Sequence, residues 1–277
     1  VAQGGAVAAL VDRAFADAQP AAAPLPLVVA DDTRLALGRL AAHWRGKFTL
    51  PLIGITGSNG KTTVKEMCAS ILRAQAAMDG FDPDSAVLAT AGNFNNDIGL
   101  PLTLLGLRAH HRAAVIEMGM NHPGEIAYLT AIAAPTVALV NNAQRAHLEG
   151  MGGLNEVARE KGAIYEGLGA DGVAVVNADD PFAAYWTGLN EHRPVLRFAL
   201  DSTAEVTGSY ILKGLGAAVA VQNSGRRIDI ELHAPGLHNV RNALAATAAC
   251  LAAGVSDQAI SVGLGGFSGA KGRLQQK

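Results

Sequence analysis

The stretch GITGSNGKTT, from Gly54 to Thr63, decides how this chain folds. It overlaps an apolar run, Pro51 to Ile55, whose length and composition are typical of a buried strand. Apolar residues after the stretch recur at helical spacing, at Val64, Met67, Cys68, Ile71 and Leu72. The sequence therefore predicts a strand, a glycine-rich turn and a helix over residues 62–77.

The residue types in this turn are those that bind phosphate groups. Glycines at 54, 57 and 60 let backbone N–H groups point inward, and the following helix adds the positive end of its dipole. Lys61 can reach terminal phosphates, and the Thr62 hydroxyl suits Mg²⁺. The turn therefore predicts a nucleotide site formed by Gly57, Ser58, Asn59, Gly60, Lys61, Thr62 and Thr63.

The turn departs from the strict phosphate-loop pattern in one place. That pattern has a glycine where this chain has Ile55, so the first glycine is displaced to Gly54. The alternative is a glycine turn whose Lys61 side chain is merely solvated. The strand and the helix on either side of the turn favour the phosphate site.

Composition bounds the classes of protein to consider. With 277 residues and 49% hydrophobic content, the chain can bury a full core, and one large domain plus a smaller piece is expected. A net charge of −2 gives no support for binding nucleic acid or an anionic membrane surface. Cys68 and Cys250 lie on apolar helical stretches, as reduced thiols of a cytoplasmic protein would. No apolar run reaches the about 18 residues that span a bilayer, so we expect no membrane insertion.

From Pro51 onward, predicted strands alternate with predicted helices. The strands are expected at 52–56, 113–118, 136–141, 173–177 and 195–198, and the helices at 62–77, 123–133, 154–167, 181–189 and 239–253. This alternation predicts an α/β fold with a mostly parallel sheet, helices on both faces, and ligands at the carboxyl ends of the strands.

Two further segments lie outside this alternation. Between Val206 and Leu232 the period changes to two, with a turn at residues 223–225 between two strands, which predicts a small antiparallel ribbon beside the main sheet. The first 47 residues are expected to form a helix, a Pro/Ala-rich loop at 19–26, a short strand at 27–30 and a helix at 33–44. They are too few for a core of their own.

Three charged or titratable residues are candidates for chemistry. Glu117 ends the apolar strand AAVIEMG, where an acid can join Thr62 in holding Mg²⁺, although a lone Glu at a strand end is usually solvated. His147 follows the next strand, and its alternative is a surface histidine. Lys161 lies in the predicted helix VAREKGAIY, where a lysine is ordinarily solvated.

Asparagines gather in two further places. The segment TAGNFNNDIGLPLTLL, residues 90–105, has a polar cluster that can cap a helix or bind ligand amides and hydroxyls. Asn239 and Asn242 are three positions apart at a helix start, so they share a face and could frame a purine edge or cap the helix. In NADDPF, Asp179 or Asp180 is expected to cap a helix.

Taken together, these motifs resemble the ATP-dependent Mur ligases of peptidoglycan precursor synthesis. The resemblance covers nearly the whole chain, and its motifs occur in the order and at the approximate spacing of the family. They are GITGSNGKTT, TAGNFNNDIGLPLTLL, VIEMGMNHPGEI, NNAQRAHLEGMGGLNEVAREKGAIY, NADDP and GLHNVRNALAA. The family's glycine loop also lacks the strict spacing, so the departure at Ile55 agrees with it.

The resemblance implies a role for each candidate residue. Lys61 and the loop amides would hold the ATP phosphates, Thr62 and Glu117 one Mg²⁺, and His147 a second Mg²⁺. Lys161 matches a position that is often carbamylated in the family. The residues that match the adenine side are Asn239 and Asn242, and those that would line the approach of the UDP-linked substrate are Thr90, Asn93 and Asn96.

The resemblance also implies a domain organisation and a reaction. Residues 1–47 would be the remnant of an N-terminal UDP-substrate domain, and 48–277 the central ATP-binding domain of a monomer whose C-terminal domain is absent. The implied reaction adds D-alanyl-D-alanine to UDP-N-acetylmuramoyl-tripeptide through an acyl phosphate, and we expect this chain alone to be inactive. The alternatives are another Mur or folylpolyglutamate-type ligase, or an ATP-binding module without ligase activity. A GTPase is disfavoured because the sequence has no Asn-Lys-x-Asp motif.

Overall fold

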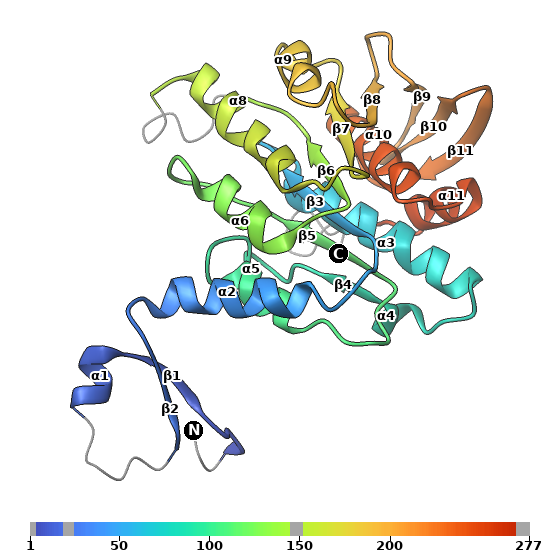
Figure 1. Ribbon diagram of the computed structural model, residues 1–277. Coiled ribbons are helices and arrows are strands. Elements are labelled where there is room, and N and C mark those ends of the chain that lie inside the picture. The colour runs from blue at the N-terminus through green and yellow to red at the C-terminus, as the bar shows by residue number, and fades with distance from the viewer. Residues whose placement is uncertain (1–3, 19–24, 145–151, 270–277) are drawn as a thin grey trace.

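A computed structural model describes residues 4–18, 25–144 and 152–269. Its main body is built on a nine-stranded sheet with the order β11-β10-β9-β8-β7-β6-β3-β5-β4 (Figure 1). The strands are β3 (Leu52–Thr56), β4 (Val87–Ala89), β5 (Ala113–Glu117), β6 (Val137–Val140), β7 (Val173–Asn177), β8 (Val195–Ala199), β9 (Val206–Lys213), β10 (Gly216–Asn223) and β11 (Arg226–Leu232). Pairing is parallel from β4 to β9 and antiparallel from β9 to β11. The predicted α/β fold is confirmed.

Helices cover both faces of this sheet, because alternate residues of its strands point to opposite sides. One face is covered by α3 (Lys61–Met78), α10 (Leu237–Ala252) and α11 (Asp257–Gly265). The other is covered by α2 (Thr33–Arg45), α5 (Gly99–Leu105), α6 (Glu125–Ala133), α8 (Leu154–Gly162), the 3₁₀ turn η2 (Ala163–Gly167) and α9 (Ala183–Gly188). In β5, for example, Val115 belongs to the first core and Ile116 to the second.

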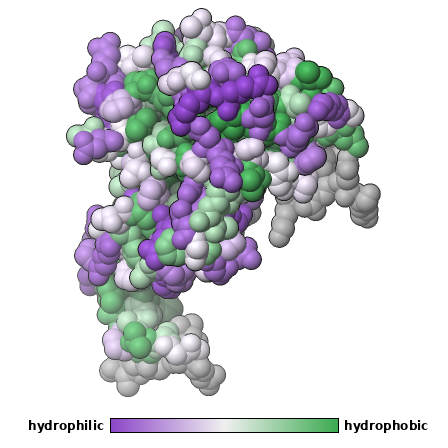
Figure 2. Space-filling model, turned by 90° about the vertical axis from the view of Figure 1, so that its right-hand side faces the viewer, coloured by the Kyte–Doolittle hydropathy of each residue, from purple (hydrophilic) through white to green (hydrophobic). Residues whose placement is uncertain are grey.

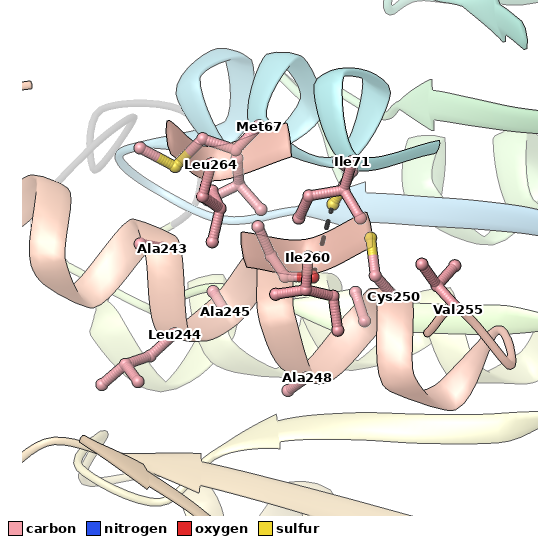
Figure 3. Close-up of a cluster of buried hydrophobic side chains, with 14 of the residues drawn as sticks. Met67, Ile71, Ala243, Leu244, Ala245, Ala248, Cys250, Val255, Ile260 and Leu264 are labelled. Carbon is pink, nitrogen blue, oxygen red and sulfur yellow. Dashed lines mark hydrogen bonds between the residues drawn. The ribbon is translucent and has the colours of Figure 1, made fainter. Parts of the chain in front are cut away.

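The helices α3, α10 and α11 pack closely in the first core. Figure 3 shows Met67 and Ile71 of α3 against Ile260 and Leu264 of α11 and the alanine-rich side of α10. A Cβ atom added to Gly263 would lie 2.4 Å from the Ile71 Cα, so only glycine allows this approach. Cys68 and Cys250 are free and buried in this core, as predicted.

The structure corrects two sequence predictions. The helix expected near the start is partly a strand, because β1 (Ala9–Asp12) pairs parallel with β2 (Leu27–Ala30) and only α1 (Arg13–Asp17) is helical. The ribbon has three strands rather than two. It continues the main sheet, since β9 pairs with β8 before it pairs with β10. The structure also contains α4 (Pro83–Ala86), β4, α5 and α11, which were not predicted.

The N-terminal part lies apart from the main body, as two views agree (Figures 1 and 2). It consists of β1, α1 and β2. Helix α2 follows it but packs on the main body, where Trp44 Nε1 donates to the Leu107 carbonyl at 3.1 Å and Arg45 Nε donates to the Ala133 carbonyl at 3.0 Å. The boundary at residue 47 stays a prediction. Among the described residues, no helix has the length and apolar character needed to cross a membrane.

Candidate nucleotide site

The glycine-rich turn connects the end of β3 to the start of α3. Gly60 stands before the first helical residue in the left-handed conformation, with φ +80°, which residues with a side chain rarely adopt. An added Cβ there would lie 2.5 Å from Asn242 Oδ1 and 2.6 Å from Asn141 Nδ2. Conformation and space therefore both require glycine. Lys61 folds back over the turn, and its Nζ donates to the Gly57 carbonyl at 2.8 Å.

A cleft of about 1040 Å³ opens beside this turn, at the carboxyl ends of β3, β4 and β5. Its wall includes the first residues of α3, the end of β5 and the polar segment that follows β4. Most of the predicted phosphate, metal and substrate residues line it, namely Ser58, Asn59, Gly60, Lys61, Thr62, Thr90, Asn93 and Glu117. The structure thus brings Thr62 and Glu117 to one cleft.

Glu117 is the last residue of β5 and is 2% exposed. Its Oε1 accepts from Asn95 Nδ2 at 2.8 Å, and its backbone N–H donates to Thr90 Oγ1 at 2.9 Å. Its Oε2 is buried and has no hydrogen-bond partner among the described residues. A buried carboxylate oxygen without a donor is costly, so a bound cation would stabilise this arrangement. The donor set, a carboxylate and the Thr62 hydroxyl, fits Mg²⁺.

Two residues that support this cleft were missed at the sequence level. Asn95 belongs to the polar segment noted above, but its bond to Glu117 depends on the tertiary fold. Lys65 is on α3 and is 1% exposed, and its Nζ donates to the Thr90 carbonyl at 2.7 Å and to Glu66 Oε1 at 2.6 Å. Hydrogen bonds therefore run from Lys65 through Thr90 to Glu117. The sequence offers no signal for Lys65, which has the spacing of an ordinary helical lysine.

Lys161 is not solvated, since the fold leaves it 1% exposed on α8. Its Nζ lies 3.8 Å from Met120 Sδ. Burial, and after it the positive charge of Lys61, lower the pKa of Lys161 to about 7, while Glu160 opposes the shift. Glu160 itself accepts from the backbone N–H groups of Gly124 at 2.8 Å and Ile126 at 2.9 Å, so α8 is anchored to the start of α6.

One of the two predicted asparagines of α10 lines a second pocket, of about 590 Å³. Asn242 lines it together with His238 and Arg241, whereas Asn239 is not one of the residues that line it. The two side chains lie on the same face of the helix, as predicted, and Asn242 Nδ2 donates to Asn239 Oδ1 at 3.4 Å. Asn59 lines both this pocket and the larger cleft, so the two cavities adjoin at the glycine-rich turn.

The remaining candidates lie elsewhere. Asn96 Oδ1 accepts from the N–H of Gly99, the first residue of α5, at 2.8 Å, and Asn96 lines a smaller pocket of about 290 Å³ rather than the cleft. Asp180 accepts from the Phe182 N–H beside α9 at 3.0 Å and also from the Ala143 N–H at 2.8 Å. His147 lies outside the described residues. Among those described, no group of three or more His, Cys, Asp or Glu side chains could hold a metal ion by itself.

Comparison with known proteins places this geometry in context. Residues 55–250 match the Mur ligase middle domain. The UDP-N-acetylmuramoyl-tripeptide–D-alanyl-D-alanine ligase of Escherichia coli (strain K12) is 42% identical over 274 residues, which are 98% of this chain and 57% of that protein. The Haemophilus influenzae enzyme of the same name is 44% identical over 90% of this chain and 53% of its own length. A crystal structure of MurF from Acinetobacter baumannii superimposes with a TM-score of 0.85 at 38% identity, over 97% of this chain and 56% of that one. The chain thus spans little more than half of these relatives.

Proposed function

Because the chain belongs to the Mur ligase family, we propose that it is the nucleotide-binding part of an ATP-dependent amide ligase of peptidoglycan precursor synthesis. The relatives from E. coli and H. influenzae are named for a UDP-N-acetylmuramoyl-tripeptide and D-alanyl-D-alanine, and we propose the same substrates here. One observation carries the proposal. Lys61 and Thr62 line the same cleft as Glu117, whose buried Oε2 has no hydrogen-bond partner among the described residues.

In this proposal the glycine-rich turn binds the ATP phosphates. Residues 57–63 supply backbone N–H groups at the start of α3, and the Lys61 ammonium reaches the terminal phosphates. Thr62 and Glu117 would hold Mg²⁺, with His147 at a second ion. Bound Mg²⁺ would supply positive charge that neutralises the phosphates.

The reaction follows from the weak electrophilicity of a carboxylate. The terminal carboxylate of the tripeptide attacks the γ-phosphate and ADP leaves, which yields an acyl phosphate. The amine of D-alanyl-D-alanine then attacks the acyl carbon, a tetrahedral intermediate forms, and phosphate leaves as the amide bond is made. Negative charge builds on the phosphoryl and acyl oxygens, and Lys61 would stabilise it. No activated Ser or Cys nucleophile is needed for this route.

We further propose that Lys161 acts as a carbamate. A neutral amine adds to carbon dioxide and loses a proton, which turns a cation into an anion. The buried position of Lys161 and its pKa of about 7 support this, because the neutral amine is well populated at neutral pH. An ammonium there would repel both Lys61 and a metal ion.

The second pocket would take the adenine base. Asn242 lines this pocket, and its Nδ2 donates to Oδ1 of Asn239, one helical turn earlier. Thr90 and Asn93 would line the approach of the UDP-linked substrate, with Asn96 ordering the segment that carries them.

The domain organisation and setting belong to the same proposal. Residues 1–47 would belong to a UDP-substrate domain, and residues 48–277 to the ATP-binding domain. We propose a cytoplasmic monomer, in keeping with its two free buried thiols.

Calorimetric titration with ATP and Mg²⁺ tests the proposal. Lys61→Ala removes a charged donor from the phosphates, and we expect it to weaken ATP binding by at least about tenfold. Lys213→Ala is the matched control, because Lys213 pairs with Glu231 on the surface of the ribbon. Equal ATP affinity of Lys61→Ala and the wild type would contradict the proposed site.

A further inference from the structure

Asn141 follows β6 directly and is buried, with 4% exposure, where the glycine-rich turn meets α10. Its Nδ2 donates to the Asn59 carbonyl at 2.9 Å and to Asn242 Oδ1 at 3.3 Å. The backbone carbonyl of Asn141 accepts from Asn177 Nδ2 at 2.9 Å, and its backbone N–H donates to the Thr56 carbonyl at 2.9 Å. Both the backbone and the side chain of Asn141 are therefore held by hydrogen bonds. Its two side-chain amide hydrogens are donated to two different segments, the glycine-rich turn and α10.

These bonds determine which way the Asn242 amide faces. A side-chain amide accepts at its oxygen and donates at its nitrogen. Because Asn141 offers a donor, Asn242 must present its Oδ1 toward Asn141. The Asn242 nitrogen then lies on the other side, where it donates one hydrogen to Asn239 Oδ1 at 3.4 Å. Its second hydrogen is left for a ligand in the pocket that Asn242 lines.

Gly60 makes room for this contact. A side chain at Gly60 would lie within 2.6 Å of both amides and would separate them. The sequence of the glycine-rich turn therefore helps to bring the Asn141 and Asn242 amides together as well as to bind phosphate.

We propose that Asn141 is a positioning residue for base recognition, which orients Asn242 so that it donates a hydrogen bond to a ring nitrogen of a purine. The inference rests on the proposed binding of ATP. Purine ring nitrogens are hydrogen-bond acceptors, so an Asn242 turned the other way would place its oxygen against their lone pairs. Asn141 lines the same pocket, but its side-chain nitrogen already donates to the Asn59 carbonyl and to Asn242 Oδ1, so it would act on the base through Asn242.

A merely structural role predicts a different result from base recognition. Asn141 also supports the Asn59 carbonyl, so any substitution is expected to weaken binding of every nucleotide. Only a role through Asn242 changes the preference for one ring nitrogen. The test therefore compares ATP with its 1-deaza, 3-deaza and 7-deaza analogues, each of which replaces one ring nitrogen by C–H.

Calorimetric titration of the whole chain with these four nucleotides is the experiment. For the wild type we expect one analogue to bind about fivefold more weakly than ATP, the value of one hydrogen bond. We call this ratio of ATP affinity to analogue affinity the deficit. In Asn141→Ala the deficit is expected to fall to about twofold or less, because Asn141 no longer holds the Asn242 amide in one orientation. Asn141→Asp is isosteric but cannot donate from its side chain, so it favours the reversed Asn242 amide and should abolish the deficit.

Asn142→Ala is the matched control. Asn142 Nδ2 donates to the same Asn59 carbonyl at 3.1 Å, and its Oδ1 accepts from the Asn59 N–H at 2.9 Å. This variant should weaken all four nucleotides by the same factor and keep the wild-type deficit. Thermal unfolding of each variant checks that it folds.

Two outcomes would overturn the inference. One is a wild type that binds all three analogues as tightly as ATP. The other is that the deficit stays at its wild-type value in Asn141→Ala or Asn141→Asp, judged on each variant that folds and binds ATP. A wild type that binds no nucleotide at all would instead refute the proposed function, and the inference with it.

Discussion

Two lysines near the nucleotide site, Lys65 and Lys161, are almost fully buried, and their surroundings differ. Lys65 donates to the Glu66 carboxylate and to the Thr90 carbonyl, which offset the loss of water. Lys161 contacts the Met120 thioether, a weak acceptor, and its pKa is lowered to about 7. Of the two, Lys161 is therefore the one suited to chemistry as a neutral amine.

The first prediction concerns Lys161 in the full-length ligase. Lys161→Ala should abolish most of the activity, measured as phosphate release, because the proposed carbamate is lost. A short carboxylic acid such as propionate should restore part of it by occupying the space with an anion. Lys213→Ala, on the exposed ribbon, should keep full activity. Full activity of Lys161→Ala without added acid would return Lys161 to a structural role.

The second prediction concerns the bond from Asn95 to Glu117. Asn95→Ala frees Glu117 Oε1, so the carboxylate is no longer held in one orientation. Groups that orient metal ligands typically contribute ten- to a hundredfold in metal affinity. We expect the Mg²⁺ concentration that half-saturates ATP binding to rise by about tenfold. Asn93→Ala, in the same cleft, should leave it near the wild-type value, and equal Mg²⁺ dependence of the two variants would refute this role.

At the scale of the element, sequence patterns predicted β3 and β7 with their observed bounds, since both are apolar runs ended by polar residues. They did not predict α11, whose three glycines within or beside it lower helix propensity. Packing against α3 stabilises it instead. Nor did they predict β1, because ALVD pairs as a strand only when β2 is beside it.

The third prediction tests the packing of α11 on α3. Gly263→Val would place its Cβ 2.4 Å from the Ile71 Cα, so the helices must separate. Overpacking of this kind costs about 1–3 kcal/mol, and we expect Tm to fall by about 5 °C. Gly265→Ala, on the same helix, would place its Cβ 3.8 Å from the Glu231 carbonyl oxygen and should change Tm little. Equal Tm values for the two variants would contradict this packing.

The fourth prediction concerns Asp179, which joins the end of β7 to the loop after β8. Its carboxylate accepts from the N–H groups of Leu200 at 2.7 Å and Ser202 at 2.8 Å. Although burial alone would raise the pKa of Asp179, these bonds lower it below 3.8. The charged form is therefore favoured in the folded state, and its stabilisation is present above pH 3.8 and disappears as the pH falls through the lower folded-state pKa.

Urea unfolding measures this effect. Asp179→Asn should lower the free energy of unfolding by about 1 kcal/mol at pH 7, and the difference should shrink as the pH falls below 3.8. Asp171→Asn, at an exposed position, is the matched control. If Asp179→Asn lowers the free energy of unfolding by the same amount at pH 7 and at pH 2.5, this explanation is ruled out.

At the scale of the whole molecule, alternation of strands and helices predicted the sheet and the edge at which the cleft opens. The position of Lys61, Thr62 and Glu117 on one cleft follows from that rule, because the carboxyl ends of neighbouring parallel strands share an edge. The burial of Lys65 and Lys161 and the bonds of Asn95 and Asn141 depend on contacts between distant segments. Periodicity in one sequence carries no information about such contacts.

The burial of β3 has a consequence for how the site responds to a nucleotide. Every residue of β3 is buried, between β5 and β6 and under helices on both faces. Its amide hydrogens should exchange with solvent only when the whole sheet unfolds. The glycine-rich turn thus follows a strand that is buried along its whole length. In the same cleft, Ala91, Gly92 and Asn93 are exposed. If a nucleotide binds, these residues should therefore lose the most conformational freedom, and their amide exchange should slow the most.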